Sequence, residues 1–97
     1  MNVSFKGNVV KVKRGTFTND KGEVVAYCRF YLLTIGKTDE NEAGYDYRKF
    51  SCKVDYYKTL IGMLESNKPV DLSVELVEQK DGTYKCRATK INDIVLN

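Results

Sequence analysis

The chain has 97 residues, of which 42% are hydrophobic and 30% charged, with a formal net charge of +3 and no His. These values fit a single domain, 1–97, with one modest core, and no stretch is long and uncharged enough to span a membrane. The N-terminal residues lack the basic and apolar runs of a signal peptide, so we expect a cytoplasmic protein.

Positive charge is concentrated toward the start of the chain. Residues 1–37 carry seven Lys or Arg against two Asp or Glu, a balance of +5, which leaves −2 for the remainder. The first predicted strand, residues 3–14, contains Gly7 and Asn8 as a predicted bulge, after which Lys11 and Lys13 share one face. This asymmetry of charge favours an anionic partner for the first two predicted strands.

The second predicted strand, residues 23–35, follows a predicted hairpin turn at residues 19–22. It is rich in β-branched and aromatic residues and lacks Gly and Pro. Because side chains alternate along a strand, its predicted core face carries Ala26, Cys28, Phe30 and Leu32. The opposite face carries Tyr27, Arg29 and Tyr31. Such a row, in steps of about 7 Å, suits a partner with flat faces and negative charge, such as single-stranded nucleic acid.

The third predicted strand, residues 45–54, repeats this pattern after a polar loop, residues 37–44. Its predicted outer face carries Tyr45, Tyr47, Lys49, Ser51 and Lys53, and its predicted core face carries Phe50, Cys52 and Val54. Asp55 is the predicted cap of a helix over residues 56–66, which the segment Asn67, Lys68 and Pro69 ends.

The fourth and fifth predicted strands, residues 70–80 and 84–94, are joined by a hairpin turn at Asp81 and Gly82. On the fifth strand the predicted core positions are Tyr84, Cys86 and Ala88, and the predicted outer positions are Lys85 and Arg87. The three cysteines have no metal-ligand spacing and lie within apolar alternations, so we interpret them as core residues and expect no metal or cofactor.

Five strands with one helix between the third and fourth give the element order of an OB-fold, an all-β domain built on a five-stranded, partly open Greek-key barrel. The sequence resembles the bacterial and phage single-stranded DNA-binding proteins of the OB-fold type over nearly its whole length. The matching segments are residues 7–10 (GNVV), 27–30 (YCRF), 47–53 (YRKFSCK), 74–76 (VEL) and 80–86 (KDGTYKC), with Tyr57, Leu60 and Leu64 in the helix.

This resemblance implies a protein that coats exposed single-stranded DNA, largely independently of sequence, during DNA replication or recombination. It also implies a short phage or mobile-element type, which would place the protein in the host cytoplasm. The family often stacks bases on Trp or Phe, whereas this chain has no Trp. The resemblance therefore transfers the stacking role to Tyr47 and, after it, to Tyr27 and Tyr31.

The candidate binding residues combine aromatic rings that stack on bases with cations that follow phosphates. The stacking candidates are Tyr27, Tyr31 and Tyr47, with Tyr45 and Phe17 as further candidates. The phosphate-binding candidates are Lys11, Lys13, Arg29, Lys49, Lys53, Lys85 and Arg87. Arg29 and Arg48 are also candidates for stacking through the guanidinium plane. Because one small domain binds few nucleotides, we expect a homo-oligomer, a dimer or alternatively a tetramer.

Alternative functions stay open at this point. The absence of His, of a triad-like Cys or Ser and of a glycine-rich phosphate loop disfavours an enzyme. A protein–protein interaction module is an alternative because a fold does not fix function, and Tyr27 and Tyr31 would then pack against another subunit. A single-stranded RNA binder is the third alternative, since nothing in the sequence specifies a contact to a 2′-hydroxyl.

Overall fold

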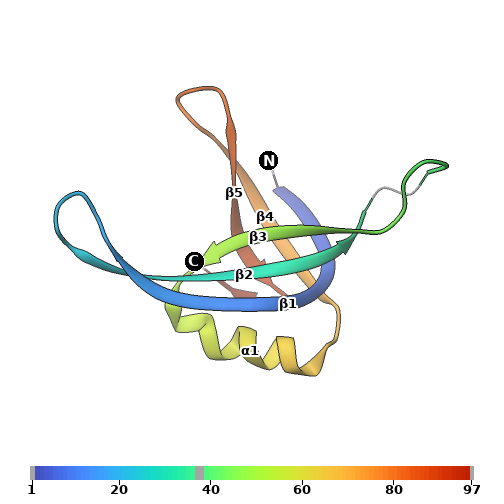
Figure 1. Ribbon diagram of the computed structural model, residues 1–97, viewed down its shortest axis with the longest axis horizontal. Helices are drawn as coiled ribbons and strands as arrows, with labels where there is room; N and C mark the ends of the chain where they lie inside the picture. Colours follow the sequence, from blue (N-terminus) through green and yellow to red (C-terminus); the bar gives the residue numbers. More distant parts are fainter. Residues whose placement is uncertain (1, 37–38, 97) are drawn as a thin grey trace.

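The computed structural model describes residues 2–36 and 39–96, so the first two residues of the predicted loop 37–44 lie outside the described residues. The described chain is mostly β-structure, a single antiparallel sheet with the strand order β3-β2-β1-β4-β5-β6 (Figure 1). The strands are β1 (Asn2–Thr18), β2 (Val24–Ile35), β3 (Tyr45–Cys52), β4 (Val70–Glu78), β5 (Tyr84–Ile91) and β6 (Ile94–Val95). A short 3-10 helix, η1 (Val54–Tyr56), leads into the α-helix α1 (Tyr57–Ser66).

The long strand β1 belongs to both halves of the sheet. Residues 2–7 pair with β4, and residues 7–18 pair with β2. Gly7 lies where the two pairings meet, and a Cβ atom there would overlap the backbone carbonyl of Leu33. The register shift lies between Val9 and Lys11, so the prediction of a bulge at Gly7 and Asn8 is wrong. The glycine is required by the close approach of β2 instead.

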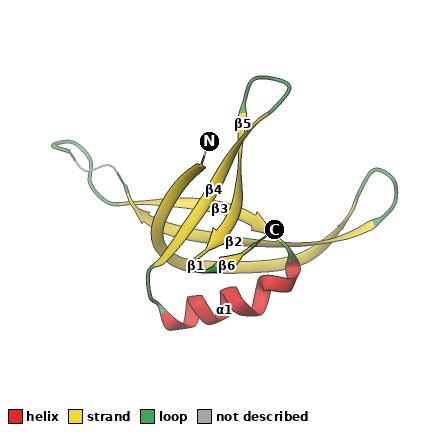
Figure 2. Cartoon of the chain, turned by 180° about the vertical axis from the view of Figure 1, so that it is seen from behind, coloured by secondary structure: helices red, strands yellow, loops and turns green. Residues whose placement is uncertain are grey.

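The core lies between the curved sheet and α1, which covers one side of it (Figure 2). Cys28, Phe30 and Leu32 of β2 are fully buried there, as the alternation predicts, and Leu60 is the buried residue of α1. The predicted helix is confirmed, and Asn67 ends it in the left-handed conformation with φ 52°. No side chain caps its start, so the prediction that Asp55 is the cap is wrong. No helix in residues 2–36 and 39–96 is long and apolar enough to cross a bilayer.

The prediction of five strands is wrong because the fifth predicted strand reverses at Asn92 and Asp93. Asn92 adopts a positive φ of 50°, and its side-chain carbonyl accepts a hydrogen bond from the backbone N–H of Asp71 at 3.0 Å. In return the N–H of Asn92 donates to the Asp71 carbonyl at 2.7 Å. Asparagine tolerates this left-handed conformation, so the chain turns here and adds β6 as a sixth strand.

The predicted barrel is also not closed. Strands β3 and β5 approach each other, but no backbone ladder joins them in the part of the chain that the structure describes. Lysines and an arginine lie on both sides of this gap, which we call the seam, and charged side chains disfavour pairing at a strand edge. The seam is therefore an open boundary between the two ends of the curved sheet.

Three predicted core positions are exposed because strand alternation continues beyond the region that the core covers. Ala26 lies toward the β1–β2 hairpin, and Tyr84 and Cys86 lie in the β4–β5 hairpin, which projects away from α1 (Figure 1). Tyr84 is 65% exposed. Only Ala88 of the predicted inward positions on β5 is buried.

Candidate nucleic-acid interface

The sheet surface that points away from the core gathers most of the predicted binding residues on three neighbouring strands. This surface, the outer face, consists of Lys11, Lys13, Gly15 and Phe17 of β1, of Val25, Tyr27, Arg29, Tyr31 and Leu33 of β2, and of Tyr45, Tyr47, Lys49 and Ser51 of β3. None of these described positions carries a carboxylate. The outer face is therefore a cationic and aromatic surface without acidic side chains of its own.

The centre of the outer face is a stack across three strands. Tyr31 has Lys11 directly opposite it on β1 and Lys49 directly opposite it on β3. The ring of Tyr47 stacks on Tyr31 with a centroid distance of 5.1 Å and an interplanar angle of 30°. Lys11 Nζ lies 5.2 Å from the centroid of the Tyr31 ring. Because β1 and β3 flank β2, Tyr31 lies between a cation and a second ring.

This arrangement separates the roles of the two tyrosines. Tyr31 is half-buried between its neighbours, whereas 56% of Tyr47 is exposed. The ring of Tyr47 therefore has surface free for a base, while its other side packs against the ring of Tyr31. Lys49 is exposed beside both rings, where an ammonium group can meet a phosphate of the same strand.

A second aromatic group lies toward the β1–β2 hairpin. The rings of Phe17 and Tyr27 have a centroid distance of 6.1 Å and an interplanar angle of 47°. Arg29 Cζ lies 4.8 Å from the centroid of the Tyr27 ring. A Cβ atom at Gly15 would lie 2.8 Å from Tyr27 Oη, so the absence of a side chain at Gly15 leaves room for this ring across β1. Phe17 is 49% exposed and is the open ring of this group.

Two cations of the outer face are placed directly opposite each other, Lys13 on β1 and Arg29 on β2. Like charges in opposite positions of a ladder repel, and the outer face supplies no carboxylate to compensate them. A bound anion between the two strands would relieve this repulsion. The pair therefore favours a phosphate partner on the line that joins the two aromatic groups.

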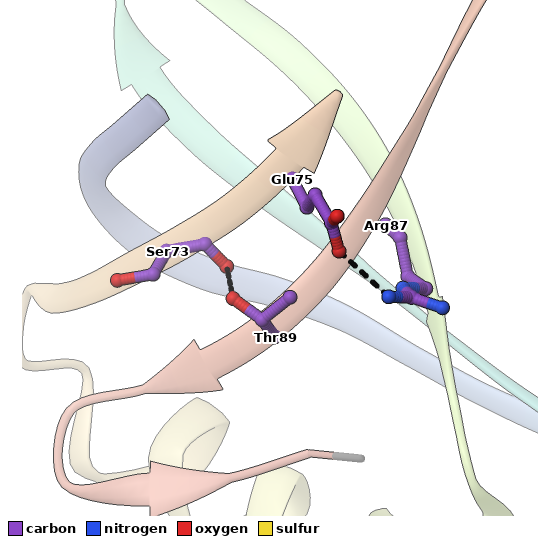
Figure 3. Close-up of polar contacts among 4 residues, drawn as sticks. All are labelled: Ser73, Glu75, Arg87 and Thr89. Carbon is purple, nitrogen blue, oxygen red and sulfur yellow. Dashed lines mark hydrogen bonds and ion pairs between the residues drawn. The ribbon is translucent and has the colours of Figure 1, made fainter. Parts of the chain in front are cut away.

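A groove with a volume of about 1140 Å³ follows the seam. We call it the seam groove, and its cationic residues are Lys49 and Lys53 from the β3 side and Lys85 and Arg87 from β5. Arg87 Nη2 lies 2.6 Å from Glu75 Oε2 on β4. Figure 3 shows these two side chains facing each other across the strand pair. Thr89 donates a hydrogen bond to the carbonyl of Ser73 at 3.1 Å in the same strand pair.

Cys28 and Cys52 do not form a reactive centre with these cations. Cys28 and Cys52 are opposite each other on β2 and β3, and burial raises the pKa of Cys28. Burial, followed by the neighbouring Cys28, raises the pKa of Cys52 to about 12. Both thiols are therefore protonated at neutral pH and are poor nucleophiles. Residues 2–36 and 39–96 contain no group of three or more His, Cys, Asp or Glu placed to hold a metal ion.

The structure divides the predicted binding residues into two adjoining sets. The outer face holds Lys11, Lys13, Tyr27, Arg29, Tyr31, Tyr47 and Lys49, and the seam groove holds Lys53, Lys85 and Arg87 together with Lys49. Tyr45 lies at the end of the outer face and is 70% exposed. Arg48 is not on this surface, because its guanidinium carbon lies 4.8 Å from the centroid of the Phe5 ring.

The sequence did not indicate the seam groove, because the approach of β3 to β5 is a long-range property of the fold. Nor did it indicate the Phe17–Tyr27 contact. Counting outward from the predicted turn at residues 19–22 places Phe17 opposite Val24, whereas the observed ladder places Gly15 opposite Tyr27 and Phe17 opposite Val25.

Comparison with known protein families and with curated proteins finds no match to this sequence. Among solved structures, the chain is similar to a small single-stranded DNA-binding protein from Streptomyces coelicolor, with a TM-score of 0.44. The two chains are 15% identical, and the match covers 97% of this chain and 92% of that one. A likeness at this level does not establish a shared fold or activity, so the function has to be argued from the geometry of the outer face.

Proposed function

We propose that this protein is an OB-fold protein that binds single-stranded DNA with little dependence on sequence. The observation that carries the proposal is the outer face, where two aromatic groups alternate with cations and no carboxylate is present. OB-folds bind oligonucleotides on the surface of their second and third strands, between the loops that join strands one to two and four to five. The outer face occupies the corresponding strands of this chain.

In the proposed mechanism, bases stack on the open rings and phosphates contact the cations between them. Tyr47 and Phe17 are the open rings, and each stacked base contributes about 1–3 kcal/mol. Lys11, Lys13 and Arg29 lie between the two aromatic groups and would neutralise the connecting phosphates. A duplex already stacks its bases against each other, so its ring faces are closed to Tyr47 and Phe17. The outer face would therefore prefer a single strand.

The proposal includes a homo-oligomer, a dimer or a tetramer, that coats DNA during replication or recombination of a phage or plasmid. Exposed apolar residues at the ends of β2, Val24 and Ile35, supply surface for contact between subunits. Several outer faces on one DNA strand would raise the overall affinity through effective concentration. The preference for DNA over RNA and the phage or plasmid setting follow from the sequence resemblance.

The proposal is tested by titrating the protein with a short oligothymidine while its tyrosine fluorescence is recorded at several salt concentrations. We expect quenching at low salt and an affinity that falls with salt, with a logarithmic slope of about −0.7 for each phosphate contacted. An oligouridine of equal length and a duplex of the same length serve as comparisons. Absence of a response at low salt, or equal affinity for the duplex, would contradict the proposal.

A further inference from the structure

The seam groove lies beside the outer face and differs from it in composition. Its cations stand on both sides of the gap between β3 and β5, and its lining in the described chain includes no carboxylate and no aromatic ring. Small, polar and aliphatic residues, such as Ser51, Ala88 and Val77, complete its surface. A groove without rings offers nothing on which a base can stack, whereas its ammonium groups are suited to phosphates.

The charges of the seam groove are largely uncompensated. Of its four basic side chains, Arg87 alone has a carboxylate partner among the described residues, Glu75 on β4. The ammonium groups of Lys49, Lys53 and Lys85 carry charge into the same gap. An anion between β3 and β5 would contact cations from both strands at once.

The seam groove is continuous with the outer face through Lys49. This residue is opposite Tyr31 in the β2–β3 register and also lines the groove. Lys53 follows four residues further along the chain, a distance of about 13 Å at the rise of an extended strand. A nucleic acid that leaves Tyr47 can therefore pass along β3 from one cation to the next without crossing an acidic side chain.

We infer that the seam groove is a second contact site for the bound strand, which holds its phosphodiester backbone while the bases stack only on the outer face. The inference rests on the proposed function, because it extends the path of the same strand. An acidic peptide is the competing occupant, since its carboxylates would find the same cations. Continuity with the aromatic rings favours the nucleic acid.

A native thiol provides a direct probe of this groove. Cys86 is exposed and lines the groove, whereas Cys28 is buried and Cys52 has a pKa of about 12. We expect a maleimide reagent to modify Cys86 first, as located by mass spectrometry. At a free oligothymidine concentration of about 100 Kd, mass action leaves about one site in a hundred empty, so the modification rate of Cys86 should fall about hundredfold.

Paired substitutions test the phosphate contacts separately from the stacking. We expect the double variant K53S/K85S to reduce the logarithmic salt slope by about 1.4, because two phosphate contacts are lost at about 0.7 each. The matched control is K58S/K68S, which removes the same charge near α1 and should leave the slope unchanged. Tyr47→Ala should weaken binding but leave Cys86 protected once the oligonucleotide is saturating.

The outcomes separate the two proposals. Tyrosine quenching with Cys86 still freely modified would overturn the seam-groove inference and leave the proposed function intact. Protection of Cys86 by oligoglutamate but not by oligothymidine would overturn it in favour of an acidic peptide. Absence of any binding to single strands would overturn the proposed function itself.

Discussion

At the scale of single residues, Tyr47 is the open ring at the centre of the outer face, with 56% of its surface exposed. Its partner Tyr31 is held between Tyr47 and Lys11. We expect Tyr47→Ala to weaken binding of an oligothymidine by about 1–3 kcal/mol, the contribution of one stacked base. Because the ring is exposed, thermal unfolding should change little. Tyr47→Phe keeps the ring and should retain affinity, and an unchanged affinity of the alanine variant would show that Tyr47 does not stack.

Glu75 restrains one cation of the seam groove through its 2.6 Å contact with Arg87. We expect Glu75→Gln to raise the affinity for single-stranded DNA at low salt and to steepen the logarithmic salt slope by up to about 0.7, because Arg87 becomes free to contact a phosphate. Glu65→Gln in α1 makes the same change in net charge away from the groove. If the two variants gain affinity equally, the gain comes from the change in net charge alone and not from the release of Arg87.

At the scale of elements, the two glycines Gly7 and Gly62 make a matched pair. A side chain at Gly7 would overlap the backbone of β2, whereas nothing lies within 4 Å of a Cβ at Gly62 in α1. We expect Gly7→Ala to destabilise the fold by about 1–3 kcal/mol, since a strand has to shift. Gly62→Ala should stabilise it by about 0.5–1 kcal/mol through helix propensity. Urea unfolding measures the change in unfolding free energy for each variant. An equal change in the two variants would contradict the close approach of β1 to β2 at Gly7.

The β4–β5 hairpin contains a pH-sensitive turn. Asp81 Oδ1 accepts hydrogen bonds from Thr83 Oγ1 at 2.6 Å and from the Thr83 N–H at 3.0 Å, and these bonds lower the pKa of Asp81 below its ordinary value of 3.8. Since the folded pKa lies below the unfolded one, this stabilisation is complete above the unfolded value and is lost as the pH falls through the folded value. We expect Thr83→Val to raise the pKa of Asp81 in an NMR titration. An identical titration midpoint in both proteins would rule out the side-chain hydrogen bond.

Local sequence patterns predicted the elements well where short-range chemistry decides them. The Asn-Asp-Lys-Gly and Asp-Gly turns, the helix and the alternation of β2 and β3 all depend on neighbouring residues, and they placed Tyr27, Arg29, Tyr31, Tyr47 and Lys49 on one surface. Alternation does not show where the core ends, so Ala26 and Cys86 were wrongly assigned to it. Closure of the sheet depends on strands that are distant in the sequence, and no local pattern reports it.

At the scale of the whole molecule, the open seam gives the two edges of β3 different backbone hydrogen bonding. One edge of β3 pairs with β2, and the other faces β5 without a ladder in the described chain. We expect the N–H groups of β3 that point into the seam to exchange with deuterium much faster than those of the β1–β2 ladder, because they lack a partner strand. Residue-resolved hydrogen exchange by NMR makes the comparison. Slow exchange on both edges of β3 would indicate a closed barrel in solution.

The double membership of β1 has a consequence for how the chain reaches its native state. Residues 7–18 find their partner, β2, directly along the chain, whereas residues 2–7 require β4, more than sixty residues later. Synthesis proceeds from the N-terminus, so β1 emerges from the ribosome before β4, the partner of residues 2–7, has been translated. Until β4 arrives, the segment around Val3 and Phe5 is an unprotected strand edge. Self-association of nascent or stalled chains is therefore expected to begin there.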